Sequence, residues 1–274
     1  MNLVWGALVV AATAGAGIAA MLFVRRRAPE GSYFADGDRA SGVFGVLATG
    51  FSVLLGFIVF LAFTSYDESR LGAEQEALVL QQQVETAQFF PATMAQELTG
   101  KLICYGRSVV HDEWPLAESG AAADEVNPWG VELFRTIVPF RPETAKDEAA
   151  YGKWLDQTSE RESARIDRMH GAVGVIPTPL WIVLILLSGV IFVFMLFFAD
   201  SAERTRTQAL LMGSVATVVA SLLLLINFLD NPLTAGVGGV KPVAMERALK
   251  VIDEALADVG REVEAPCDTL GRRV

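Results

Sequence analysis

The amino-acid sequence predicts an all-α integral membrane protein with four transmembrane helices and a helical soluble domain. Of its 274 residues, 52% are hydrophobic and 20% are charged, and the mean hydropathy of +0.40 is too high for one soluble domain of this length. Four stretches contain no Asp, Glu, Lys, Arg or His, and each has the roughly 20 residues that a helix needs to cross a bilayer. Because lipid offers the backbone no hydrogen-bond partner, helices are favoured over strands.

These stretches divide the chain into alternating membrane and soluble segments. The predicted spans cover residues 3–24, 43–64, 180–199 and 209–229. We expect four regions: 1–64 with the first two spans and a short basic loop, 65–179 as an acidic helical soluble insert, 180–229 as a membrane hairpin, and 230–274 as a soluble helix and tail that pack on the insert.

The distribution of positive residues predicts the orientation in the membrane. The first span is preceded by no basic residue and followed by Arg25, Arg26 and Arg27, which indicates a retained anchor rather than a cleaved signal. The loop 25–42 carries four Lys/Arg residues and the loop 200–207 carries two, and such loops stay in the cytoplasm. The insert and the tail would then lie outside an inner or plasma membrane.

The second span has one face of small or weakly polar residues on an otherwise apolar helix. The face consists of Gly45, Thr49, Ser52, Gly56 and Phe63. Strong helix formers continue to about Phe90, so we expect one long helix in which Leu71, Leu78 and Val84 pack and the Glu and Gln side chains are exposed.

Further soluble helices are predicted from capping and periodicity. We expect them at 92–110, ending before His111, at 130–138, at 144–169 and at 243–259, with an irregular loop over 116–130.

Charge and motifs exclude several classes of function. The insert holds 19 Asp/Glu against 10 Lys/Arg, a difference of −9, which argues against nucleic acid as a partner. This charge predicts a solvated acidic surface or, alternatively, a vestibule that concentrates cations. No metal spacing, phosphate loop or nucleophile elbow is present, so we expect no enzyme, cofactor or metal; a hydrolase using His111 has little support.

The two cysteines leave two alternatives open. Cys104 lies in the insert and Cys267 in the tail, on the same predicted side of the membrane. They pair as a disulfide if that side is oxidising, and otherwise they are buried free thiols.

The lack of ionisable residues in the spans favours passive conduction over coupled transport, which places such groups at membrane depth. The face from Gly45 to Phe63 is the candidate pore lining, and lipid, ions and further copies of the chain are the expected partners. Since four helices of one chain do not easily enclose a pore, a channel would be a cyclic homo-oligomer. The alternative is a non-conducting membrane scaffold or accessory subunit, whose small-residue faces only pack helices.

Two short motifs resemble a known family. After the fourth span the chain reads Asp230-Asn231-Pro232-Leu233, followed by Gly236, which is similar to the acidic-Asn/Asp-Pro-Phe-Gly signature after the last membrane helix of bestrophin channels. Tyr66-Asp67 and Glu74-Gln75-Glu76-Ala77 resemble the bacterial bestrophin-like membrane proteins. The resemblance covers about residues 40–260 and rests on these motifs.

The resemblance implies a homopentamer with an anion-conducting axial pore lined by the second membrane helix, and a soluble domain built from insert and tail. Phe51, Phe57, Phe60 and Phe63 are then candidates for an aromatic constriction, and the alternative for each is a lipid-facing or packing role. Leu233 replaces the expected Phe and no run of aspartates follows, which puts a calcium clasp in doubt. Bestrophin soluble domains are cytosolic, whereas the arginine count places the insert outside.

Overall fold

The computed structural model describes residues 3–119, 127–172, 174–234 and 236–274. In these ranges all regular secondary structure is helical, apart from one isolated β-bridge between Cys267 and Arg273. The prediction of an all-α fold is confirmed. The chain divides into two compact units, Met1–Thr64 with Val175–Asp230 and Ser65–Gly174 with Asn231–Val274.

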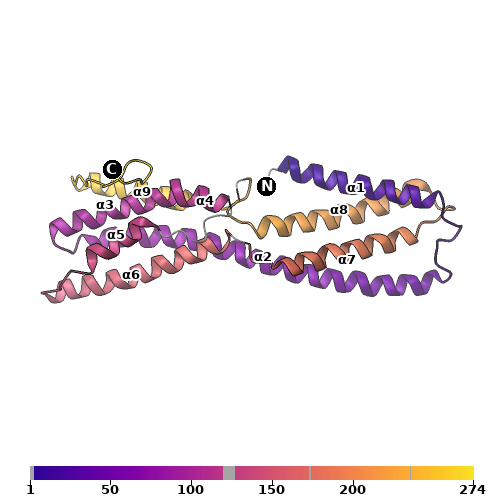
Figure 1. The fold of residues 1–274 in the computed structure, drawn as a ribbon, viewed down its shortest axis with the longest axis horizontal. Helices are drawn as coiled ribbons and strands as arrows, with labels where there is room; N and C mark the ends of the chain where they lie inside the picture. The colour runs from indigo at the N-terminus through magenta and orange to yellow at the C-terminus, as the bar shows by residue number, and fades with distance from the viewer. Residues whose placement is uncertain (1–2, 120–126, 173, 235) are drawn as a thin grey trace. The chain divides into compact units, whose positions relative to one another are not determined.

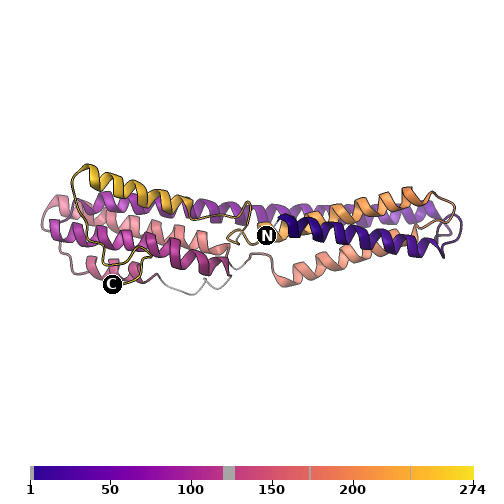
Figure 2. The same ribbon diagram turned by 90° about the horizontal axis from the view of Figure 1, so that it is seen from above.

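The first unit holds four helices that are long and apolar enough to cross a membrane, and they run side by side in Figures 1 and 2. They are α1 (Leu3–Arg25), the first part of α2 (Gly37–Ala87), α7 (Thr178–Phe197) and α8 (Thr205–Leu229). Phe51, Leu55 and Ile58 of α2 are buried against α7 and α8. One side of α2 is therefore covered by side chains of α7 and α8.

Small residues set the close packing of α1 on its neighbours. A Cβ added to Gly17 would lie 3.0 Å from the ring of Phe192 and 3.3 Å from the Cβ of Ala216. A Cβ added to Gly213 of α8 would lie 3.0 Å from Ile18. Larger side chains at these positions would force the helices apart.

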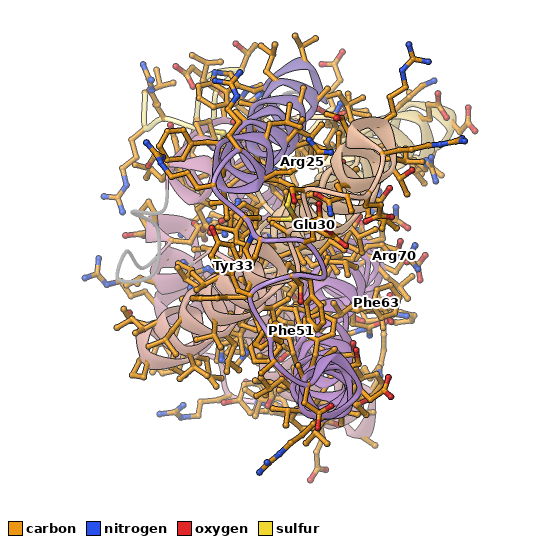
Figure 3. All side chains as sticks on the ribbon, turned by 90° about the vertical axis from the view of Figure 1, so that its right-hand side faces the viewer. Arg25, Glu30, Tyr33, Phe51, Phe63 and Arg70 are labelled. Carbon is orange, nitrogen blue, oxygen red and sulfur yellow. A yellow bond between two sulfur atoms is a disulfide. The ribbon has the colours of Figure 1, made fainter. Side chains whose placement is uncertain are left out.

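The two loops of the first unit meet at one end of it. The Arg25 guanidinium donates to the carbonyls of Ser201 and Glu203, and the Gly31 N–H donates to Asp200 Oδ1 at 3.1 Å. Figure 3 looks onto this end, with Arg25, Glu30 and Tyr33 labelled. The basic loops are thus on the same side of the membrane helices.

The second unit packs helices from the insert and the tail around the remainder of α2. They are α3 (Ala92–Ser108), a π-helix η1 (Val109–Glu113), α4 (Trp114–Glu118), α5 (Pro128–Ile137), α6 (Ala145–His170) and α9 (Val243–Asp258). Their core is apolar, with Leu80, Leu102 and Trp154 fully buried. Local sequence sets the helix starts, because Asn127 caps α5 and Thr144 forms a capping box with Asp147 in α6.

Two expectations about the insert are wrong. The chain does not leave the helix before His111 but continues through η1 into α4, and α5 begins two residues before the predicted position. The π turn accommodates Pro115, which lacks an N–H and would crowd the carbonyl four residues earlier in a regular α-helix. Of the expected loop 116–130, residues 120–126 lie outside the described residues.

The predicted packing of α2 is also wrong. Leu71 and Leu78 are 49% and 47% exposed, whereas Glu76 and Gln83 are fully buried; Val84 packs as expected. The reason is that α6, which covers this side of α2, brings two arginines rather than apolar side chains.

Candidate functional site

All five residues of the candidate pore face are exposed in the single chain. These residues are Gly45, Thr49, Ser52, Gly56 and Phe63. A Cβ added to Gly45 or Gly56 would meet no atom within 4 Å, and the Ser52 hydroxyl donates to the Ala48 carbonyl at 2.8 Å. The face is therefore not used for packing inside the chain.

The candidate constriction residues do not lie together. Phe51 is only 6% exposed, in the core between α2, α7 and α8, whereas Phe57 and Phe60 are 60% and 64% exposed. Phe60 lies one turn from both Gly56 and Phe63, so it borders the exposed face. Phe51 points to a different side of the helix, toward α7 and α8.

The motif after the fourth span makes structural contacts. Asp230 is buried, and its Oδ1 accepts hydrogen bonds from the N–H groups of Val175 (2.7 Å) and Ile176 (2.9 Å). The Pro232 carbonyl accepts from the Val240 N–H at 2.9 Å. One carboxylate thus ties the end of α8 to the segment that leads into α7.

The remaining motif residues shape the turn that follows. Asn231 accepts hydrogen bonds from Thr234 at its carbonyl, and Gly236 has a φ of 150°, which favours glycine. A Cβ on Gly171 would lie 2.2 Å from the Pro232 ring, so this turn fits against the end of α6 only because residue 171 is a glycine.

The second unit contains a buried ionic network, where the sequence predicts exposed Glu and Gln side chains on α2. Arg168 of α6 is fully buried between two carboxylates, with its Nε 2.5 Å from Glu76 Oε2 and its Nη2 2.6 Å from Glu113 Oε2. The Tyr105 hydroxyl donates to Glu76 at 2.6 Å, and Asn127 and Arg165 donate to Glu113. The network joins α2, α3, η1 and α6 at one point.

The network holds Glu113 ionised. Burial alone would raise the pKa of Glu113, but Arg168 and Arg165 outweigh it and leave that pKa below the ordinary value. Burial would lower the pKa of Arg168, but Glu76 and Glu113 raise it instead. Burial and the Glu76 charge raise the pKa of Tyr105 well above its usual value, so the phenol stays a hydrogen-bond donor.

The sequence does contain a signal for this network. Glu76 and Gln83 are seven residues apart on α2, and Arg161 and Arg168 are seven apart on α6. The structure pairs Arg168 with Glu76 and Arg161 with Gln83, the latter at 2.6 Å. Matching polar spacings on two long helices therefore indicate antiparallel contact, a pattern that a search for apolar periodicity misses.

The tail is fastened to the insert. Cys104 of α3 and Cys267 form a disulfide, and the Trp129 indole N–H donates to the Gly271 carbonyl at 2.7 Å. Within the described residues no group of three His, Cys, Asp or Glu side chains could hold a metal ion, and His111 is exposed.

Comparisons with known proteins agree with this architecture. A family model described as the bestrophin-like domain matches residues 9–245. The fold is similar to the crystal structure of a bacterial bestrophin homologue from Klebsiella pneumoniae, with a TM-score of 0.65, 13% identity, and coverage of 95% of this chain and 100% of that one. A point mutant of the homologue gives a TM-score of 0.66 at 14% identity, covering 91% and 99%. No curated protein matches the chain.

Proposed function

Because the chain belongs to the bestrophin-like family, we propose that it forms a homo-oligomeric channel, a pentamer by family resemblance, that conducts ions passively through an axial pore lined by α2. The observation that carries the proposal is the exposed face from Gly45 to Phe63, which is small and weakly polar in a span without ionisable residues. Apolar side chains of α7 and α8 cover the opposite part of α2, which supports an opening on the exposed face, between copies of the chain.

A large side chain on the face from Gly45 to Phe63 should block ion conduction. We expect Gly56→Trp to abolish ion flux through purified protein in a planar bilayer, because an indole on each copy would fill a narrow axial opening. Gly15→Trp is the matched control, since a Cβ there also meets open space and the residue lies on α1. Unchanged ion flux through an intact Gly56→Trp oligomer would show that α2 does not line the pore. A wild-type protein that carries no current would favour a non-conducting scaffold.

We also propose that the second unit lies outside the cytoplasm. The basic loops that meet at Arg25 and Ser201 support this orientation, because positive residues remain in the cytoplasm. The Cys104–Cys267 disulfide is independent support, because disulfides persist mainly in oxidising compartments.

Labelling of introduced thiols tests the orientation. Ser163 and Ser201 are both exposed, Ser163 on α6 of the second unit and Ser201 in the loop between α7 and α8. We expect a membrane-impermeant maleimide to label Ser163→Cys in intact cells and Ser201→Cys only after permeabilisation. The reverse pattern would place the second unit in the cytoplasm.

A further inference from the structure

The first unit has an apolar groove between α1, α7 and α8. Its volume is about 820 Å³, which lies within the roughly 300–1,000 Å³ of common ligand sites. On each helix the lining residues recur every three or four positions, so each helix presents one face to the groove. These faces run from Val9 to Ala20 on α1, from Trp181 to Phe192 on α7 and from Val215 to Asn227 on α8.

The groove is about as long as one leaflet of a bilayer is thick. Its lining residues extend over 11 positions on α1 (9 to 20) and α7 (181 to 192) and 12 on α8 (215 to 227). At a rise of 1.5 Å per residue this is roughly 17 Å, and half of the hydrocarbon layer is about 15 Å. The groove begins at Trp181 and Asn227, within three residues of the start of α7 and the end of α8, and reaches just beyond the middle of α7. Its mouth is therefore at the edge of the spans away from the loops that meet at Arg25 and Ser201.

Beyond this mouth the groove is suited to an apolar ligand. The Thr13 hydroxyl donates to the Val9 carbonyl at 2.8 Å, and the Ser188 hydroxyl donates to the Leu184 carbonyl at 2.7 Å. Both hydroxyls are thus satisfied within their own helices. The described residues that line the groove include no charged side chain, so it presents hydrocarbon along most of its length.

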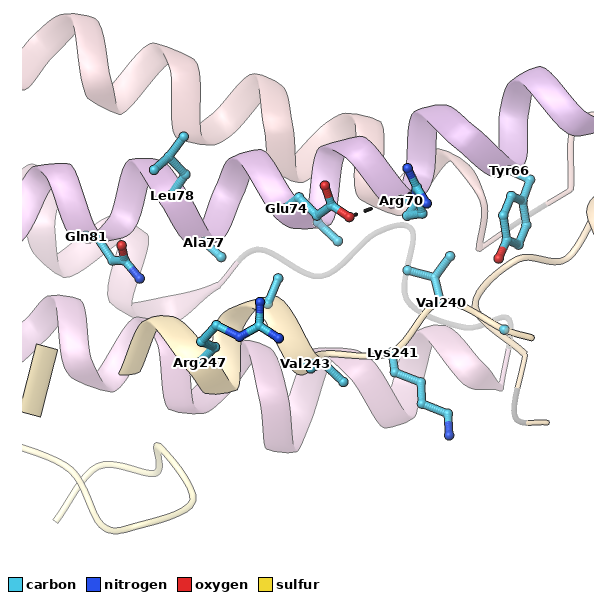
Figure 4. A pocket seen from close by; sticks show the side chains of 13 residues that line it. Tyr66, Arg70, Glu74, Ala77, Leu78, Gln81, Val240, Lys241, Val243 and Arg247 are labelled. Carbon is cyan, nitrogen blue, oxygen red and sulfur yellow. Dashed lines mark ion pairs between the residues drawn. The ribbon is translucent and has the colours of Figure 1, made fainter. Parts of the chain in front are cut away.

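The second unit has a groove of a different kind, between α2 and the start of α9. Its volume is about 650 Å³, and charged side chains such as Arg70, Glu74 and Arg247 line it (Figure 4). Arg70 and Glu74 lie 3.9 Å apart as an exposed ion pair, as on a surface in contact with water. The groove of the first unit instead lies on helices that are apolar enough to cross a membrane. The two grooves therefore suit different classes of ligand.

We infer that the groove between α1, α7 and α8 binds an acyl chain of a membrane phospholipid, with the headgroup at the mouth formed by Trp181 and Asn227. The length of the groove matches the depth of one leaflet, and its walls match the chemistry of an alkyl chain. Tryptophan is enriched where the hydrocarbon meets the headgroups. A helix of a second copy does not fit inside the groove, because a cylinder about 10 Å across and 17 Å long has a volume of roughly 1,300 Å³.

A side chain that fills the groove tests the inference. Gly189 lines the groove, and a Cβ there would meet no atom within 4 Å, so Gly189→Phe adds a ring without a backbone clash. The protein is reconstituted in phospholipid vesicles that contain a phospholipid with a diazirine in its acyl chain, irradiated, and mapped by peptide mass spectrometry. We expect the wild type to carry most adducts on groove residues such as Ser188 and Leu223, and Gly189→Phe to lose them.

The matched control is Gly15→Phe. Gly15 lies on α1 at the depth of the groove, is not among its lining residues, and a Cβ there also meets no atom within 4 Å. This variant should keep the groove adducts. Ile182 and Leu186 are exposed on α7 outside the groove and report ordinary contact with the bilayer. Adducts that are as frequent on Ile182 as on Ser188, or that survive Gly189→Phe, would overturn the inference.

The mass of the intact oligomer in mild detergent supplies a second measurement. We expect the wild type to retain phospholipid and Gly189→Phe to lose it. Gly189→Leu adds a smaller side chain at the same position and should show a partial loss, which keeps the test available if Gly189→Phe does not assemble. A retained free fatty acid, or no retained lipid, would overturn the inference. Neither measurement depends on conduction, so a protein that holds the lipid but carries no current would refute the channel and leave the lipid site standing.

Discussion

Arg168 is the residue on which the charge balance of the second unit depends. Its guanidinium is the buried counter-charge shared by Glu76 and Glu113. Arg168→Ala would leave two carboxylates buried close together, and breaking such a pair costs about 3–5 kcal/mol. We expect a loss of that order in the free energy of unfolding of the second unit, measured by urea titration of the detergent-solubilised protein followed by near-UV circular dichroism.

Arg70→Ala is the control for this prediction. Arg70 lies on the surface of α2 beside Asp67 and Glu74, and exposed pairs contribute less than about 1 kcal/mol to the free energy of unfolding.

The pH dependence of the stability supplies a second check. The lowered pKa of Glu113 means that its stabilisation is present above the ordinary value of 4.5 and is lost as the pH falls through the lower folded pKa. The difference in free energy of unfolding between wild type and Arg168→Ala should therefore shrink in acid. Equal destabilisation by Arg168→Ala and Arg70→Ala would contradict the prediction.

The contact between α2 and α6 depends on Gly72. A Cβ there would lie 2.5 Å from the Arg168 backbone nitrogen and 2.8 Å from the Ala164 carbonyl oxygen, neither of which can move away as a side chain does. We expect Gly72→Ala to destabilise the second unit by about 1–3 kcal/mol through overpacking, in the same urea titration.

Gly152→Ala on α6 should have the opposite sign. A Cβ there meets no atom within 4 Å, so the variant gains helix propensity worth up to about 1 kcal/mol without a clash. Stabilisation by both Gly72→Ala and Gly152→Ala would contradict the close contact of α2 and α6 at Gly72.

The same pair of helices shows what the sequence predicts and what it does not. The four spans could be predicted because hydrocarbon requires long uncharged helices, and α9 because its apolar residues recur at helical spacing. The buried side of α2 could not be predicted from hydrophobicity, because Glu76 and Gln83 are stabilised there by arginines from a helix some 80 residues away in the chain. Residue size and polarity predict the candidate pore face, but they do not indicate which side of α2 meets α7 and α8, and Phe51 is buried on that side.

The Cys104–Cys267 bond determines whether a cut chain falls into two pieces. It closes a covalent ring with a sequence separation of 163 residues, and that ring includes α7 and α8. A single backbone cut inside it therefore yields no separate fragment. We expect a protein with a site-specific protease sequence inserted after Pro142, in the exposed α5–α6 connection, to run as one species after cleavage and as two once a reductant is added. Two fragments in the absence of reductant would show that the ring is open, whereas the intact ring keeps a nicked molecule in one piece across the bilayer.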